Sequence, residues 1–176
     1  MRKKMDSRKK DFTLPFSLTA FVVILDQLSK AFIAVNWPIQ GTLIKDIFSN
    51  GFLFIYHVRN KAIAFSLGHN LPDQFRFPLF VVVPILVLAF LVLYYFKTGD
   101  FSRLQRWAIA GIIGGGIGNM IDRIFRPDGV VDFISVKFYG LFGMERWPTF
   151  NAADSSVVIC CFILLITMLK PQKRQG

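Results

Sequence analysis

The chain has 176 residues, of which 53% are hydrophobic, and its mean hydropathy is +0.48. This composition excludes an ordinary soluble domain of the same length, and the apolar residues form long blocks of the kind that span membranes. The formal net charge is +10. Because the cations cluster beside the apolar blocks, as the positive-inside rule describes, we expect no nucleic-acid partner.

Four apolar blocks predict four transmembrane helices within a single integral membrane domain, 1–176. The expected spans are 14–35, 77–96, 107–124 and 153–169. Six Lys and Arg residues precede the first span, three lie at the turn between the second and third spans, and three follow the last span. This bias predicts that both termini are cytoplasmic and that loops 36–76 and 125–152 are extracytoplasmic.

The first apolar block admits two interpretations. A basic head followed by a short apolar stretch is also the usual form of a signal peptide. However, polar residues from Asp26 to Lys30 occupy the place of a small-residue cleavage site, and apolar residues resume afterwards, which favours a retained helix. Asp26 and Lys30 are four residues apart and can pair on one helix face. The spacing is compatible with a structural ion pair and with a brace for a functional site.

The loop between the first two spans contains an aromatic and β-branched segment. Residues 52–58 follow Asn50-Gly51 and predict one or two strands lying against the membrane or a partner. The chain has two histidines, His57 and His69, whose spacing matches no zinc motif. We interpret both as surface or interfacial residues and expect no metal and no other cofactor.

The third span contains five glycines. No lysine follows them as a phosphate-binding loop requires, and their spacing differs from the dinucleotide-binding fingerprint. They instead repeat at four-residue intervals, 111/115 and 114/118, a spacing that lets helix backbones approach closely. The pattern therefore predicts a helix-packing face.

Three aspartates near the outer ends of the last two spans are candidates for a catalytic pair. Asp122 is followed by Arg123, and a neighbouring cation favours the charged form and a structural role. Asp132 follows two valines and Asp154 begins an apolar run, so burial could raise the proton affinity of either. We favour the pair Asp132 and Asp154, and pairs that include Asp122 remain open.

Two adjacent carboxyl groups would share one proton, because both cannot ionise cheaply. The charged member can then accept a proton from water while the neutral member donates to the scissile carbonyl. This is hydrolysis of a peptide bond by general acid–base catalysis. The chain has no Gly-x-Ser-x-Gly or His-Glu-x-x-His motif that would indicate a different hydrolase.

Five short blocks then occur in a diagnostic order. They are Asp26-Gln-Leu-Ser-Lys30, Asn60-x-x-x-Ala64-Phe65-Ser66, Gly118-Asn119-x-x-Asp122-Arg123, Val130-Val131-Asp132-Phe133 and Phe150-Asn151-x-Ala153-Asp154. Together they resemble the signature blocks of the bacterial signal peptidase II family, and the resemblance covers nearly the whole chain. The chain departs from the family at 61–63, where it reads Lys-Ala-Ile, and in the long aromatic stretch 137–149.

The resemblance implies an all-α membrane protein with four transmembrane helices and a small extracytoplasmic β-sheet cradle. It implies an aspartic endopeptidase that removes signal peptides from diacylglyceryl-modified prolipoproteins, cutting before the lipidated cysteine at the outer face of the inner membrane. Asp132 and Asp154 would be catalytic. The pocket residues would be Asn60, Asn119, Arg123 and Asn151, and the supporting residues would be Asp26, Lys30 and Asp122. The expected partners are prolipoproteins and membrane lipids, and the expected state is a monomer.

Two alternatives belong to other classes. A small transporter would need an acidic residue near the bilayer midplane, for which Asp26 is the candidate. A membrane scaffold without enzymatic activity would show no catalytic loss in any aspartate-to-asparagine variant.

Overall fold

Each of the four predicted spans is a helix in the computed structural model, which describes residues 12–61 and 72–169. The four helices are long and apolar enough to cross a membrane. The spans are α2 (Phe16–Asn36), the continuous segment Pro78–Lys97, α5 (Arg103–Phe125) and α6 (Ala152–Leu169). These bounds confirm the four predicted spans to within four residues.

The second span is assembled from three consecutive helical segments. A short helix α3 (Asp73–Phe77) leads into a π-helical turn η2 (Pro78–Val82), and the α-helix α4 (Val83–Lys97) follows. Pro84 is the second residue of α4 and lies just after this π-helical turn, so the hydrogen bond that its missing N–H cannot make is lost at the junction of the two segments.

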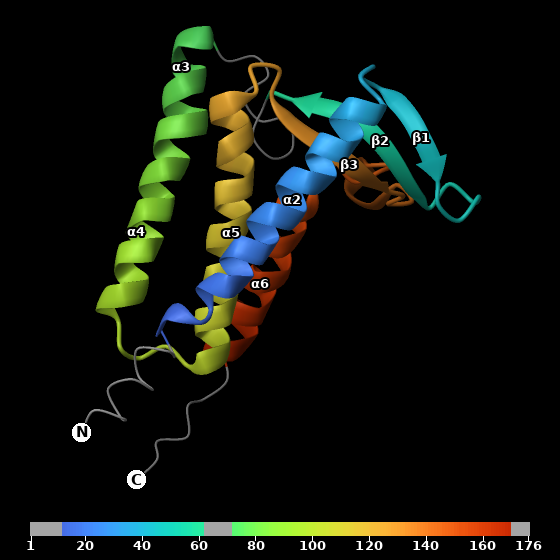
Figure 1. Ribbon diagram of the computed structural model, residues 1–176. Helices are drawn as coiled ribbons and strands as arrows, with labels where there is room; N and C mark the ends of the chain where they lie inside the picture. The colour runs from blue at the N-terminus through green and yellow to red at the C-terminus, as the bar shows by residue number, and fades with distance from the viewer. Residues whose placement is uncertain (1–11, 62–71, 170–176) are drawn as a thin grey trace.

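Helix α5 begins four residues earlier than its apolar run suggests. Ser102 accepts a hydrogen bond from the backbone N–H of Gln105, and the Gln105 side chain accepts one from the Ser102 N–H. This capping box satisfies the first free amides of the helix. Helix α5 is the central helix of the bundle, since it contacts α2, α4 and α6 (Figure 1).

The glycines of α5 form the packing face that their spacing predicts. A Cβ atom at Gly115 would collide with the carbonyl oxygen of Ala153 in α6. One at Gly114 would lie 3.1 Å from the Cα atom of Thr19 in α2. The backbones of α2 and α6 therefore approach α5 on faces that have no room for larger side chains.

A three-stranded antiparallel sheet lies at one end of the bundle. Its strands are β1 (Thr42–Asp46), β2 (Leu53–Asn60) and β3 (Val130–Val136), in the order β1-β2-β3. The strand predicted at 52–58 is confirmed as β2, and together with the four spans the sheet confirms the predicted fold. Asp132 lies within the predicted connection 125–152, in the strand β3, which the sequence did not indicate and which pairs with β2.

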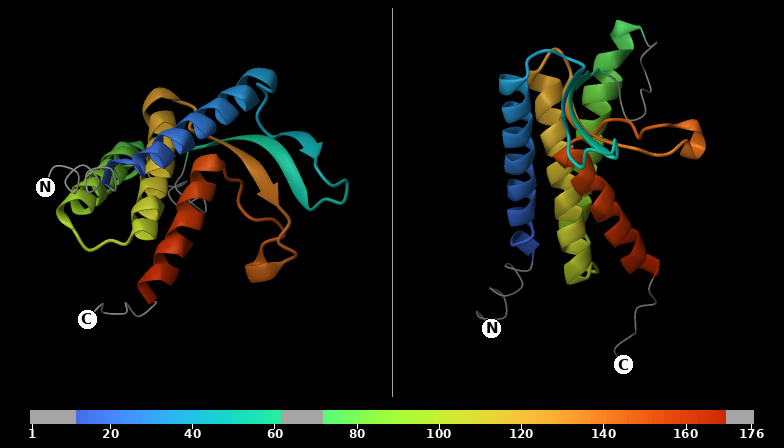
Figure 2. Two further views of the ribbon diagram at one scale, coloured as in Figure 1. Left: turned by 60° about the horizontal axis from the view of Figure 1, so that its bottom comes forward. Right: turned by 90° about the vertical axis from the view of Figure 1, so that its right-hand side faces the viewer.

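Apolar contacts attach the sheet to α2. Val131 and Phe133 of β3 form a buried cluster with Ile33, near the end of α2, and Trp37 packs against it. Figure 2 shows the sheet beside the ends of the helices, and the chain that follows β3 loops outward before it returns to the start of α6. The first residue of α2 and the last residue of α6 lie at the opposite end (Figure 1).

The interpretation of His57 as a surface or interfacial residue is wrong. His57 lies in β2 with 1% of its surface exposed, and its Nδ1 atom is hydrogen-bonded to the carbonyl oxygen of Trp37. The imidazole therefore joins the sheet to the segment that follows α2. His69 and the family departure at 62–63 lie outside the described residues.

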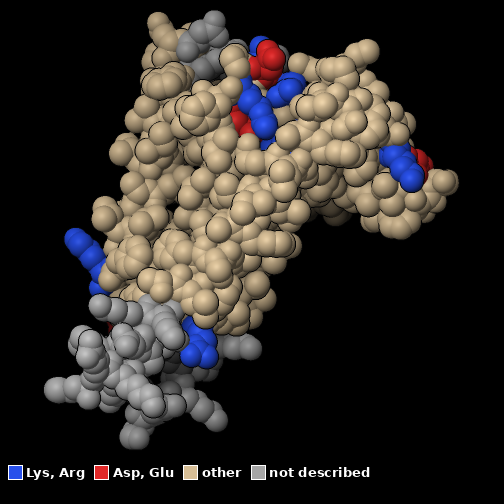
Figure 3. Space-filling view, in the orientation of Figure 1, with Lys and Arg blue, Asp and Glu red and all other residues tan. Residues whose placement is uncertain are grey.

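Charged side chains avoid the middle of the bundle. On the face shown in Figure 3, Lys, Arg, Asp and Glu atoms appear near the two ends of the molecule and on the sheet, with an uncharged belt between them. Such a belt matches the hydrocarbon layer of a bilayer.

The substitution Gly115→Val tests the close approach of α5 and α6. The new side chain would force the Ala153 backbone away, and overpacking of this kind costs about 1–3 kcal/mol. We expect the melting temperature of the protein in detergent to fall by several degrees. Gly99→Val is the matched control, because nothing lies within 4 Å of a Cβ atom at Gly99. Equal melting temperatures for both variants would contradict this packing.

Candidate active site

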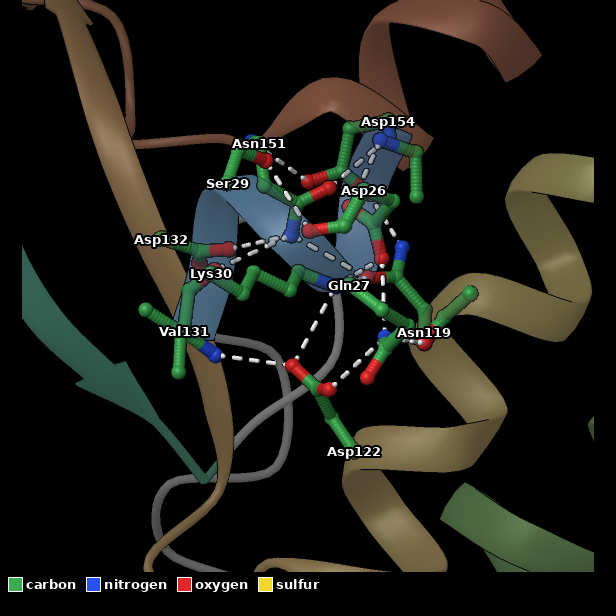
Figure 4. Close-up of polar contacts among 12 residues, drawn as sticks. Asp26, Gln27, Ser29, Lys30, Asn119, Asp122, Val131, Asp132, Asn151 and Asp154 are labelled. Atoms are coloured by element: carbon green, nitrogen blue, oxygen red, sulfur yellow. Dashed lines mark hydrogen bonds and ion pairs between the residues drawn. The ribbon is translucent and has the colours of Figure 1, made fainter. Parts of the chain in front are cut away.

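Most of the polar residues singled out in the sequence meet in one buried cluster at the sheet end of the bundle (Figure 4). Residues from α2, α5, β3 and α6 contribute to it. We call this group the polar cluster, and its members are Asp26, Lys30, Asn119, Asp122, Asp132, Asn151 and Asp154.

Lys30 is the centre of the polar cluster. Its side chain is fully buried, and its ammonium nitrogen lies 2.8 Å from Oδ2 of Asp26 and 3.1 Å from Oδ2 of Asp122. It also donates to Oδ1 of Asn119 at 2.9 Å. A lysine ammonium has three N–H donors, so these three acceptors match them in number. The predicted ion pair of Asp26 and Lys30 is present.

The two carboxylate partners of Lys30 each bind the residue that precedes a candidate catalytic aspartate. Oδ1 of Asp26 accepts from the backbone N–H of Ala153 at 3.0 Å. Oδ2 of Asp122 accepts from the backbone N–H of Val131 at 3.1 Å. The buried ions of α2 and α5 therefore fix the start of α6 and the start of the edge strand β3, one residue before Asp154 and Asp132 respectively.

The cations that pair with Asp122 are not the one expected from the sequence. Asp122 is bound by Lys30 and, at 2.6 Å, by Nη1 of Arg126, one turn further along α5. Arg123 instead lines the cavity together with Asn60, which donates a hydrogen bond to Asp132. Asp122 therefore belongs with the ions that hold the backbone, and Arg123 lies on the cavity side of the cluster.

Two asparagines connect the candidate aspartates. Nδ2 of Asn151 donates to Oδ1 of Asp132 at 2.7 Å, while Oδ1 of Asn151 accepts from the backbone N–H of Asp154 at 3.0 Å. Nδ2 of Asn119 donates to Oδ1 of Asp154 at 2.7 Å. Asn151 thus spans the distance between the two aspartates.

The orientation of both amides follows from partners that can only donate. The ammonium group of Lys30 can only donate hydrogen bonds, so Asn119 turns its oxygen toward the ammonium and its NH₂ group toward Asp154. The backbone N–H of Asp154 likewise requires the Asn151 oxygen, which leaves the NH₂ group for Asp132. The chain of contacts from Lys30 therefore determines which donors face the carboxyl groups.

Asp132 is almost completely buried, with 2% of its surface exposed. Its Oδ2 atom accepts from Nδ2 of Asn60 at 2.9 Å, in addition to the bond from Asn151. Burial raises the pKa of Asp132 from 3.8 to about 7. The charge of Asp154 acts in the same direction, while the amide hydrogen bonds and the charge of Lys30 oppose the rise. A carboxyl group with this pKa can hold a proton at neutral pH.

A cavity of about 280 Å³ lies beside these aspartates. Asn60, which donates a hydrogen bond to Asp132, lines it together with Arg123, so one wall of the cavity contacts a candidate catalytic group through Asn60. The remaining walls are formed by Lys61, Phe77, Phe80, Val81, Arg126, Pro127 and Gly129. The mixture of apolar walls and a few convergent polar groups is typical of a substrate site.

Sequence reasoning missed three residues of this site. Gln27 donates to Oδ2 of Asp26 and Oδ1 of Asp122, both at 3.1 Å, and Arg126 pairs with Asp122. Gly129 has a φ of +102°, and a Cβ atom there would lie 2.5 Å from the carbonyl oxygen of Asn60. The turn residues Pro127-Asp128-Gly129 are a sequence feature that could have indicated this close approach of β2 and β3.

Comparison with known proteins places the chain in a family. A family model described as Signal peptidase (SPase) II matches residues 18–170. The chain belongs to this family. The result confirms the family that the five sequence blocks resemble, and with it the prediction that the chain is a peptidase.

Relatives and solved structures agree with the family match. The lipoprotein signal peptidase of Treponema pallidum (strain Nichols) is 42% identical over 170 residues, covering 97% of this chain and 90% of that protein. The lipoprotein signal peptidase of Treponema denticola is 48% identical over 160 residues, covering 88% and 87%. A bacterial membrane enzyme structure determined by the in meso method is 31% identical with a TM-score of 0.75, covering 93% of this chain and 92% of that one.

The structure of this signal peptidase II family member does not support the transporter alternative. Asp26, the one residue on which it depended, is fully buried and is neutralised by Lys30 at 2.8 Å. It also accepts a backbone N–H from α6. A carboxylate with these partners has a structural role.

Replacing Lys30 tests whether the buried ammonium supports the site. Lys30→Met leaves the carboxylates of Asp26 and Asp122 buried without it, and breaking a buried ion pair costs about 3–5 kcal/mol. We expect a strongly lowered melting temperature. The triple variant that adds Asp26→Asn and Asp122→Asn should recover part of the loss, because the unpaired charges are then removed.

The matched control is Lys137→Met. Lys137 is one-third exposed and lies 3.8 Å from Glu145, and surface ion pairs contribute at most about 1 kcal/mol. Thermal unfolding of all three variants in one detergent provides the measurement. Equal effects of Lys30→Met and Lys137→Met would show that Lys30 does not organise the cluster.

Proposed function

We propose that this chain removes signal peptides from diacylglyceryl-modified prolipoproteins, with Asp132 and Asp154 as its two catalytic carboxyl groups. Membership in the signal peptidase II family and the name of its relatives, lipoprotein signal peptidase, support the substrate class. One observation carries the assignment of the catalytic pair. Asn151 links the two aspartates beside a cavity, and the pKa of one of them is raised to about 7.

The geometry supports different roles for the two aspartates. Asp132, whose pKa is raised by burial, holds the shared proton and donates it to the oxygen of the scissile carbonyl. Asp154 accepts a proton from the attacking water, so that the water oxygen can bond to the carbonyl carbon. Asp154 then gives its proton to the leaving nitrogen while Asp132 takes a proton back from a hydroxyl of the tetrahedral intermediate, so that the peptide bond breaks and the dyad again holds one proton. The two apparent pKa values of such a pair belong to the dyad as a unit.

The neighbouring residues keep this pair in place. Asn119 and Asn151 direct their NH₂ groups at Asp154 and Asp132, which limits rotation of the carboxyl groups. Asn60 and Arg123 line the cavity next to the dyad, where the main chain of the substrate would lie. Asp26, Lys30 and Asp122 act through the backbone, since their contacts lead to Ala153 and Val131.

We further propose that the dyad faces the extracytoplasmic side of the bacterial inner membrane. The beginning of α2 and the end of α6 lie at the end of the bundle opposite to the sheet (Figure 1). The sequence carries clustered Lys and Arg residues just beyond both of those ends, which favours a cytoplasmic location for them. A dyad at the outer surface meets a lipidated cysteine where its acyl chains remain in the bilayer.

The proposal treats 1–176 as a single domain that is active as a monomer. One chain supplies Asp132, Asp154, the two bridging asparagines and the cavity residues. Its contacts with the bilayer are made by the exposed apolar side chains of the spans, among them Phe90 and Phe162.

Substitution of the dyad tests the proposal directly. Purified Asp132→Asn and Asp154→Asn should each cleave a diacylglyceryl-modified precursor about 10²–10⁴-fold more slowly, because each loses a group that moves a proton. Cleavage is followed by the shift of the precursor on a gel. Asp128→Asn is the control, since Asp128 is an exposed aspartate four residues before Asp132.

Asp122→Asn distinguishes the catalytic pair from its supports. Asp122 holds the backbone of Val131, so its variant should lose stability and retain measurable cleavage. If Asp122→Asn is inactive while Asp132→Asn cleaves normally, the pair is assigned wrongly. Cleavage of an unlipidated precursor at the same rate as the lipidated one would contradict the substrate class.

The raised pKa of Asp132 predicts the pH dependence of the reaction. Cleavage should fall about tenfold per pH unit as the pH rises above about 7, because the dyad loses its shared proton. Stability should change with the same sign. The folded state favours neutral Asp132, so this contribution is complete below pH 3.8 and is lost as the pH rises through about 7.

Asp132→Asn separates this effect from other titrations. The variant should lose less thermal stability than the wild type between pH 6 and 8, whatever its activity. A melting temperature that depends on pH equally in both proteins would show that Asp132 is not the group that titrates.

A further inference from the structure

The stretch 137–151, which joins β3 to α6, contains an uncharged, apolar loop. The backbone N–H of Phe138 donates to the carbonyl oxygen of Glu145 at 2.8 Å, and that of Gly140 donates to Met144 at 3.1 Å. We call the residues between these bonds, 138–144, the tip. Its sequence, Phe-Tyr-Gly-Leu-Phe-Gly-Met, contains no charged residue. Figure 2 shows this segment projecting sideways from the bundle.

The tip presents large apolar side chains away from the protein. Tyr139 is 69% exposed, Leu141 is 53% exposed and Phe142 is 82% exposed. Single exposed apolar residues are common on protein surfaces, but three within four positions of one loop indicate a binding surface.

Two of these residues have a left-handed backbone conformation. Tyr139 has a φ of 55° and Phe142 a φ of 54°, in the left-handed region that residues with a Cβ atom adopt at a cost in free energy. The turn thus places two non-glycine residues where glycine would be unstrained. These residues have the most exposed side chains of the tip, and such strain at an exposed position indicates a functional constraint.

The base of the tip is firmly attached to the sheet. The guanidinium of Arg146 donates to Oγ and the carbonyl oxygen of Ser135, at 2.8 and 2.7 Å, and to the carbonyl oxygen of Gly51 at 2.7 Å. It also lies over the ring of Phe54, 3.9 Å from the centroid. Arg146 therefore joins β3 to the turn between β1 and β2 and keeps the tip from folding back.

The height of the tip matches the outer boundary of the bilayer. In the right-hand view of Figure 2, the tip extends from the sheet at about the level where α6 begins. Helix α6 is almost wholly apolar from Val157 onward, so its polar first turn, with Asp154, marks the edge of the hydrocarbon layer. Aromatic side chains concentrate at that depth, and charged ones, here Lys137 and Glu145, remain at the base of the tip.

We propose that the tip is an interfacial membrane anchor, which inserts Tyr139, Leu141 and Phe142 among the headgroups of the outer leaflet. The tip continues directly from β3, the strand that carries Asp132. Its insertion therefore fixes the height of the catalytic strand above the bilayer. The occupant of this surface is the lipid of the membrane that the chain already spans.

A depth measurement tests the anchor without reference to activity. A nitroxide label is attached at Phe142→Cys, in a chain whose Cys160 and Cys161 are replaced by alanine, and the protein is placed in phospholipid vesicles. Asp128→Cys provides the aqueous reference and Leu165→Cys, on the exposed face of α6, the hydrocarbon reference. The label at 142 should be relaxed by oxygen and protected from an aqueous nickel chelate, at a depth between the two references.

Other outcomes would overturn the proposal. A label at 142 that the nickel chelate reaches as readily as at 128 would place the tip in water. A label protected from both oxygen and nickel would show that protein covers the tip, as in a contact with a second copy of the chain.

An activity measurement adds the functional consequence and rests on the proposed function. The double variant Leu141→Ser/Phe142→Ser should cleave a lipidated precursor about tenfold more slowly in vesicles, because burial of these side chains no longer sets the height of β3. In detergent micelles, which impose no fixed height, the rate should equal that of the wild type. Ile39→Ser is the control, since Ile39 is 74% exposed and lies outside the tip.

An equal loss of activity in vesicles and micelles would indicate that the tip has a structural role, and it would overturn the anchor. Full activity of the double variant in vesicles would also overturn the anchor. If the wild type itself fails to cleave, the proposed function fails, while the depth of the label at 142 still decides the anchor.

Discussion

The site depends on one buried ammonium group. Taking Lys30 out of water costs several kcal/mol, and the cost is offset only when every N–H has a well-placed acceptor. Asp26, Asp122 and Asn119 supply these acceptors from two helices. Each of the three acceptors then binds a group next to or on one of the two proposed catalytic aspartates, so one ion coordinates the position of both. The precision of the dyad is thus set inside the bundle, behind the surface that would meet substrate.

The sequence predicts the parts of this protein that depend on local pattern. The four spans follow from apolar runs, and β2 follows from its density of aromatic and β-branched residues. Strand β3 was missed because Val-Val-Asp-Phe-Ile shows no alternation, since Val130, Val131, Asp132 and Phe133 are all buried. His57 was misread because its burial comes from a contact with Trp37, a tertiary feature that no local pattern reports.

The contacts of the site itself lie beyond such reasoning. Asp26 and Ala153 are separated by 127 positions in the sequence, and Lys30 and Asn119 by 89. The family resemblance indicated the residues, and the spacing of Asp26 and Lys30 indicated their ion pair, but the remaining partners were not predictable. The neighbour of Asp122 in the chain is Arg123, whereas its partners in space are Lys30 and Arg126. A helix turns adjacent residues about 100° apart, so sequence neighbours rarely pair.

The membrane-spanning helices contribute unequally. Helix α5 packs glycines against α2 and α6, and all three helices supply the polar cluster. Helix α4 contacts α5 more sparsely, and an apolar groove of about 560 Å³ lies between them. Pro78–Lys97 contributes Phe80 and Val81 to the cavity wall near the dyad. The second span therefore encloses the site, while the other three build it.

The charges around the dyad balance when it holds one proton. Lys30, Arg123 and Arg126 are three cations, and they face the carboxyl groups of Asp26, Asp122, Asp132 and Asp154, of which one is then neutral. An unbalanced charge would experience the transmembrane voltage, at about 2.3 kcal/mol per 100 mV across the full membrane. A neutral cluster, in which the proton only changes neighbours, experiences almost none. Movement of a proton between Asp132 and Asp154 inside such a cluster would therefore respond little to the membrane potential.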